Sequence, residues 1–121
     1  MKKIVKSFVY AFNGLKLCFA SEVNFKIHLL SAIAVLLLGV VFKISNTEWL
    51  AVIICIAFVT ALEMINTAIE KLCDMVNAAV DPGIKKVKDI AAGAVLVVAV
   101  GSLVIGVIIF LPKIIVYIKS L

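Results

Sequence analysis

The possible folds of this chain are limited most strongly by one segment. It is a long apolar run that continues into four regularly spaced polar residues. The run extends from Trp49 to Leu62 without a charged residue, and behind it stand Glu63, Asn66, Glu70 and Asp74. Their spacing places all four on one stripe of a helix, about 16 Å long at about 1.5 Å per residue. A carboxylate at membrane depth costs about 2.5–3.5 kcal/mol and is usually functional. We therefore predict an active-site face at a membrane–water boundary.

The composition is typical of a helical membrane protein. Of the 121 residues 65% are hydrophobic, and the mean hydropathy is +1.28, far above that of a soluble domain. The length allows a single domain, residues 1–121, with three or four helices. The net charge of +5 comes entirely from lysine, and we interpret it as a signal of membrane topology rather than of nucleic-acid binding. Three cysteines without metal-type spacing predict neither a disulfide nor a metal site: Cys18, Cys55 and Cys73.

The expected fold is an all-α membrane protein. An amphipathic helix over residues 2–21 is expected to lie on the membrane surface, although packing in the bundle is the alternative. Three transmembrane helices follow, at about 26–43, 48–72 and 87–111. We expect helix caps at Ser21, Asn46 and Thr47, and an end of the last helix at Pro112. Gly93, Gly101, Ser102 and Gly106 would allow backbones to approach closely.

The distribution of lysines predicts the orientation. Nine lysines lie in the N-terminal segment and around the loop 73–87, against three on the opposite side. The positive-inside rule then places the N-terminus and this loop in the cytoplasm and the C-terminus outside. The polar stripe, Glu22 and the cluster 85–89 would meet on the cytoplasmic face, where ATP is available.

Carboxylates beside lysines at a bilayer surface suit phosphoryl transfer to a lipid alcohol. Such a reaction requires Mg²⁺ on hard oxygen ligands, cations on the phosphates and an acceptor for the hydroxyl proton. Lys85, Lys86 and Lys88 can contact phosphates, and the deeper Glu63 can serve as the base. No Walker or protein-kinase glycine motif is present, so nucleotide would bind in another way.

Two other functions remain open at this stage. The acidic stripe could serve an ion or proton transporter, although the uncharged crossings argue against a relay. The chain could also be a non-enzymatic membrane adaptor. Some residues also have purely structural interpretations: Asp89 as a helix cap, Asp74 as a solvated charge, Asn66 as an interhelical hydrogen-bonding group, and His28 as an interfacial or bundle hydrogen-bonding group.

Two motifs carry a resemblance to a known family. One is the string Glu-x-x-Asn-x-Ala-x-Glu-x-x-x-Asp from Glu63 to Asp74, and the other is Lys88-Asp89 fourteen residues later. The segments 12–16 and 22–28 extend the likeness over about residues 5–112. The chain resembles the prokaryotic diacylglycerol kinases, small integral-membrane lipid kinases that include the undecaprenol kinases.

The resemblance implies a homotrimer in a bacterial cell membrane, with Mg²⁺-ATP as donor and active sites shared between subunits. It implies that Glu63 is the catalytic base and that Asn66 supports it or the phosphate. Glu22 and Glu70 would hold the metal. The nucleotide would contact Lys88, Asp89, Asp74, Tyr10 and Lys6. Asp81 stands where the family often has histidine, and neither diacylglycerol nor undecaprenol is favoured as acceptor.

Overall fold

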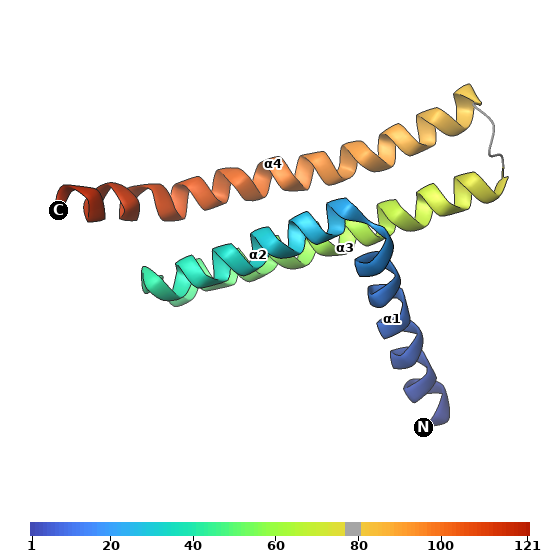
Figure 1. The fold of residues 1–121 in the computed structure, drawn as a ribbon, viewed down its shortest axis with the longest axis horizontal. Helices are drawn as coiled ribbons and strands as arrows, with labels where there is room; N and C mark the ends of the chain where they lie inside the picture. The colour runs from blue at the N-terminus through green and yellow to red at the C-terminus, as the bar shows by residue number, and fades with distance from the viewer. Residues whose placement is uncertain (77–80) are drawn as a thin grey trace.

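The chain folds entirely into helices in the residues described by the computed structural model, 1–76 and 81–121. These helices are α1 (Lys2–Ser21), α2 (Val23–Val41), α3 (Asn46–Val76) and α4 (Pro82–Lys119). The last three are long and apolar enough to cross a membrane, which confirms the expected all-α fold with three candidate membrane spans. In Figure 1, α4 runs along α3, α2 overlies α3, and α1 projects from the start of α2 at a steep angle.

Two transmembrane helices are longer than the apolar segments that predicted them. The last helix begins at Pro82 rather than near residue 87, and the second continues to Val76. The end predicted at Pro112 is wrong, because α4 continues through this proline to Lys119. Helix-breaking residues are tolerated in membrane helices when neighbouring contacts hold the next turn. Here Ile114 packs against the apolar core, and Lys113 binds α3.

The ends of the helices are capped by residues other than those expected. Ser45 and Glu48 cap α3 reciprocally: the Glu48 amide donates to Ser45 Oγ at 3.2 Å, and the Ser45 amide donates to Glu48 Oε1 at 3.0 Å. This is a capping box, so the caps expected at Asn46 and Thr47 are wrong. Ser21 is the last residue of α1, and its hydroxyl donates to the Leu17 carbonyl instead of capping α2.

Asp81 caps α4, which gives this residue a structural role. Its Oδ1 accepts from the amides of Gly83 and Ile84 at 2.8 and 3.1 Å, and Pro82 occupies the first turn. Both features favour a helix start. The interpretation of Asp89 as the cap is therefore wrong, because Asp89 lies inside the helix.

The apolar core lies at the end of the bundle opposite α1. It consists of Ile44, Val52, Ile109 and Phe110. A Cβ atom on Gly39 would lie 2.6 Å from the Trp49 ring, so glycine is needed for this close approach. Around Gly93, Gly101 and Gly106, in contrast, an added Cβ would meet nothing within 4 Å, so the close approach expected there is not made within the described chain.

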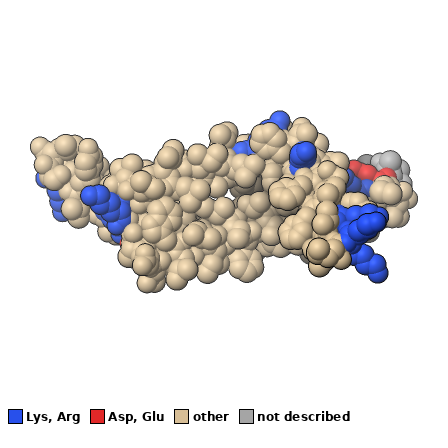
Figure 2. Space-filling view, turned by 90° about the horizontal axis from the view of Figure 1, so that it is seen from below, with Lys and Arg blue, Asp and Glu red and all other residues tan. Residues whose placement is uncertain are grey.

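The charged residues gather at the two ends of the molecule. Figure 2 shows a broad uncharged surface between lysines near one end and a mixed cluster of lysines and carboxylates toward the other. Because the helices alternate in direction, the second end holds the start of α2, the last turns of α3 and the first turns of α4. The polar stripe, Glu22 and the cluster 85–89 thus belong to one end of the bundle.

Candidate active site

The polar stripe of α3 passes from a buried to an exposed environment along the helix. Glu63 is 4% exposed and Asn66 9%, Glu70 is partly buried, and Asp74 is exposed. The four residues share one face, as their spacing predicted. This gradient gives Glu63 the deepest position and places Asp74 at the open end.

The buried carboxylate of Glu63 has a partner on the neighbouring helix. Nε2 of His28 on α2 lies 3.4 Å from Glu63 Oε2. A buried carboxylate without a partner is costly, so this contact helps to retain Glu63 inside the bundle. His28 therefore lies inside the bundle in contact with a buried carboxylate, and this connection to the acidic stripe was not predicted from the sequence.

Asn66 is oriented by Glu70 one helical turn further on. Its Nδ2 donates to Glu70 Oε1 at 3.2 Å. Its Oδ1 is buried and has no hydrogen-bond partner among the described residues. Buried polar atoms are nearly always paired, so this oxygen is suited to accept from a hydroxyl group of a bound molecule.

Two residues that the sequence analysis did not assign to the site join α1 to this part of α3. Thr67 is 3% exposed, and its side chain hydrogen-bonds the buried Cys18 thiol. Burial raises the pKa of the Cys18 thiol, and the charge of Glu22 adds to this rise. Thr67 lies four residues after Glu63, and this helical spacing was the signal that could have identified it.

The residues expected to bind nucleotide lie at the exposed end of the stripe or on α1. Lys88 Nζ donates to Asp74 Oδ1 at 2.6 Å, and Lys85 Nζ donates to Asp89 Oδ2 at 2.6 Å. Lys6 and Tyr10 lie on the exposed part of α1 that projects from the bundle (Figure 1). The structure therefore brings Lys88 to the stripe but does not bring Lys6 and Tyr10 to it.

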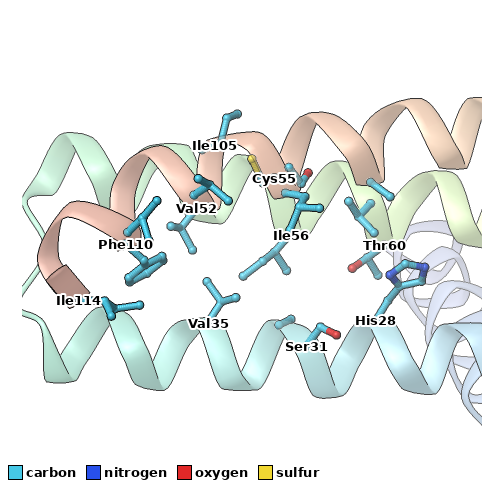
Figure 3. Close-up of a pocket in the computed structure, with 18 residues that line it drawn as sticks. His28, Ser31, Val35, Val52, Cys55, Ile56, Thr60, Ile105, Phe110 and Ile114 are labelled. Atoms are coloured by element: carbon cyan, nitrogen blue, oxygen red, sulfur yellow. The ribbon is translucent and has the colours of Figure 1, made fainter. Parts of the chain in front are cut away.

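An apolar cavity of about 590 Å³ lies between α2, α3 and α4. Figure 3 shows His28 and Thr60 at one end of it, and Phe110 and Ile114 at the other. Most of the wall between them is aliphatic, with Val35, Val52 and Ile56 among its members. The cavity therefore has two polar side chains, His28 and Thr60, at one end, and its remaining aliphatic length suits a hydrocarbon chain.

The carboxylates of this end are compatible with a magnesium ion that is bound together with a nucleotide. No group of three His, Cys, Asp or Glu residues converges within the described part of the chain. Mg²⁺ in phosphoryl-transfer enzymes, however, usually takes only one or two carboxylates and completes its shell with phosphate oxygens and water. Glu70 has one oxygen engaged by Asn66, and Glu22 lies at the α1–α2 junction. These two residues fit that donor set.

Comparison with known proteins supports the expectation raised by the two motifs. Residues 9–110 match the family model described as prokaryotic diacylglycerol kinase. The chain is 42% identical over 113 residues to an undecaprenol kinase of Bacillus subtilis, which covers 93% of this chain and 92% of that protein. It is 32% identical over 110 residues to a diacylglycerol kinase of Synechocystis, covering 90% and 63%. A Helicobacter pylori diacylglycerol kinase is 30% identical over 96 residues, covering 79% and 75%.

The chain belongs to the prokaryotic diacylglycerol kinase family. It is a lipid kinase and a membrane protein. Membership in a family of kinases supports the enzymatic hypothesis over the transporter and the adaptor.

Proposed function

We propose that the protein transfers the γ-phosphoryl group of ATP to the hydroxyl group of a membrane lipid at the cytoplasmic surface. The products are the lipid phosphate and ADP. The observation that carries this proposal is a buried carboxylate, Glu63, in contact with His28, which lines the polar end of an apolar cavity. A lipid alcohol needs this arrangement, because its chain requires an apolar environment while its hydroxyl must reach a base.

In the proposed reaction Glu63 acts as the general base. It accepts the proton of the lipid hydroxyl while the hydroxyl oxygen forms a bond to the γ-phosphorus. The bond from the γ-phosphorus to the bridging oxygen breaks, and ADP leaves with that electron pair. The free Oδ1 of Asn66 accepts a hydrogen bond from a water beside the acceptor hydroxyl, because the single proton of the hydroxyl goes to Glu63. An acceptor atom is unsuited to a phosphate oxygen, so we assign this oxygen of Asn66 to the acceptor side of the site rather than to the phosphate.

The donor is proposed to bind at the exposed end of the stripe as its magnesium complex. The metal, held by Glu22 and Glu70, would neutralise charge on the phosphates. Lys88 contacts the phosphates, while Asp74 and Asp89 bind the remainder of the nucleotide. Lys6 and Tyr10 lie on α1 and would reach a nucleotide through bending of α1 or in a neighbouring subunit.

We propose undecaprenol as the preferred acceptor. The cavity that leads away from His28 is lined largely by aliphatic side chains along three helices, and a polyprenyl chain can lie along such a wall. The relative that matches over almost the whole of both chains is an undecaprenol kinase. Diacylglycerol carries two chains and a more polar head, so we expect it to be the weaker substrate.

The assembly is proposed to be a homotrimer in a bacterial cell membrane, with shared active sites. The N-terminus and the connection between α3 and α4 face the cytoplasm, and α1 lies along the membrane surface. Large apolar side chains are exposed along α2, α3 and α4, which leaves surface for both lipid and neighbouring subunits. The lysines at the active-site end support this orientation.

Phosphate transfer measured in mixed micelles tests the proposal. The purified protein is given ATP labelled on its γ-phosphate, Mg²⁺, and either undecaprenol or diacylglycerol at equal mole fraction. We expect labelled lipid from both acceptors and a higher kcat/KM with undecaprenol. The absence of transfer to either lipid would overturn the proposed function, whereas a preference for diacylglycerol would overturn only the choice of acceptor.

A further inference from the structure

We infer that His28 is a positioning residue for the catalytic base Glu63, an inference that rests on the proposed function. The imidazole would donate a hydrogen bond to one carboxylate oxygen and leave the other free for the lipid hydroxyl. This assigns a role in the reaction to a residue of α2, whereas the acidic motif that defines the site belongs to α3.

The first support is the geometry of the contact. His28 Nε2 lies 3.4 Å from Glu63 Oε2, and the side chain of His28 is 28% exposed against 5% for that of Glu63. Catalytic hydrogen bonds are often long in the absence of substrate and tighten in the reacting complex. The contact joins α2 to α3, so a small shift between these helices changes the direction of the carboxylate.

The second support is the position of His28 on the cavity wall. Figure 3 shows its ring at the polar end of the cavity, close to Thr60 and facing the aliphatic length beyond. The other polar side chain of α2 in this wall is Ser31, whose hydroxyl already donates to the Ile27 carbonyl at 2.9 Å. His28 is therefore the polar side chain of α2 on this wall that contacts Glu63.

A carboxylate at the end of a flexible side chain needs such a partner to have a defined direction. Glu63 has three rotatable side-chain bonds, and the terminal one has a broad preference. Fixing one oxygen limits the positions of the other, and a displacement of about 1 Å at a reacting group can reduce the rate about a hundredfold. His28 fixes the direction of the Glu63 carboxylate and does not exchange a proton with the lipid.

The test separates the hydrogen bond from the volume of the side chain. His28→Gln keeps a donor near the position of Nε2, whereas His28→Asn is polar but too short to reach Glu63, and His28→Leu removes the donor. Leu30→Ala is the matched control, because Leu30 lies on α2 and is exposed. The full-length protein is assayed in mixed micelles with varied ATP and varied undecaprenol.

We expect His28→Leu and His28→Asn to lower kcat by about 10- to 100-fold, with both KM values within about threefold of wild type. His28→Gln should keep kcat within about threefold, and Leu30→Ala should match the wild type. A purely structural role would lower the yield of folded protein and would not distinguish Gln from Asn in kcat per folded molecule.

The inference is overturned if kcat of His28→Asn stays within about twofold of wild type, or if His28→Gln loses as much as His28→Asn. The comparison of Gln with Asn remains decisive if the Leu variant does not fold, since both variants keep a polar side chain. A wild type that transfers no phosphate would overturn the proposed function itself, so the two failures are distinguishable.

Discussion

The ammonium group of Lys88 lies 2.6 Å from the carboxylate of Asp74, so the first turns of α4 are joined to the last turns of α3. Both residues are proposed to contact the nucleotide, and in this structure they contact each other. The side chain of Asp74 is 62% exposed and that of Lys88 37% exposed, and ion pairs in contact with solvent contribute little to stability. A triphosphate can therefore displace Asp74 from Lys88 at low cost.

Replacing Lys88 by methionine should weaken ATP binding without unfolding the protein. We expect Lys88→Met to raise KM for ATP at least about tenfold, because a charge-assisted contact to phosphate is lost. The midpoint of unfolding in detergent should hardly change. Lys71→Met, at an exposed lysine of α3, is the control and should leave KM unchanged. Equal KM values for the two variants would contradict the assignment of Lys88.

Removal of the proposed base should abolish turnover while preserving the fold. Glu63→Gln keeps the volume and polarity of the side chain but removes the proton acceptor, so we expect kcat to fall by about 10²–10⁴-fold. Glu48→Gln, at the opposite end of the same helix, serves as the control, with kcat near that of wild type. A Glu63→Gln enzyme with more than a tenth of wild-type kcat would show that another group takes the proton.

The ion pair between Lys113 and Glu48 should stabilise the end of the bundle away from the site. Lys113 Nζ lies 2.7 Å from Glu48 Oε2 and also donates to the Ile109 carbonyl. A double-mutant cycle with Glu48→Gln and Lys113→Met should give a small favourable coupling in the free energy of unfolding in micelles. Coupling indistinguishable from zero would mean that the pair contributes nothing.

A methyl group at Gly39 should destabilise the contact between α2 and Trp49. The added Cβ would lie 2.6 Å from the Trp49 ring and 3.1 Å from Ile44, so either ring or helix must move. We expect Gly39→Ala to lower the free energy of unfolding by about 1–3 kcal/mol. Gly101→Ala is the matched control on α4, because an added Cβ there would meet nothing within 4 Å among the described residues. Loss of stability in the control instead would indicate a contact between subunits at Gly101.

Loss of the cap at Asp81 should weaken the start of α4. Asp81→Ala should cost about 1 kcal/mol, while Asp81→Asn, which keeps a capping oxygen, should cost only a few tenths. Thermal unfolding in detergent measures both variants, with KM for ATP recorded in parallel. If KM rises while stability is unchanged in both variants, Asp81 acts on the nucleotide rather than on the helix.

The helical class, the three membrane spans and the stripe of α3 could be predicted from the sequence, because each depends on local periodicity and hydropathy. The side-by-side position of Glu63, Asn66 and Glu70 follows from the helix alone. The helix ends were less predictable. The actual cap at Ser45 lies next to the residues expected, Asn46 and Thr47, whereas the cap at Asp81 lies one residue before Pro82 and was assigned to Asp89. The helix α4 passes Pro112 because contacts of Ile114 and Lys113 hold the next turn.

The sequence by itself determined which residues share a helix face and which family the motifs indicate. Only the tertiary structure decided which side chain from another helix reaches that face. Nothing in the local pattern around His28 points to Glu63, 35 positions later in the chain, because that contact depends on how α2 packs against α3. The tertiary structure also explains why Asn66 Oδ1 has no hydrogen-bond partner among the described residues. Burial in the bundle removes the water that would otherwise donate to this oxygen.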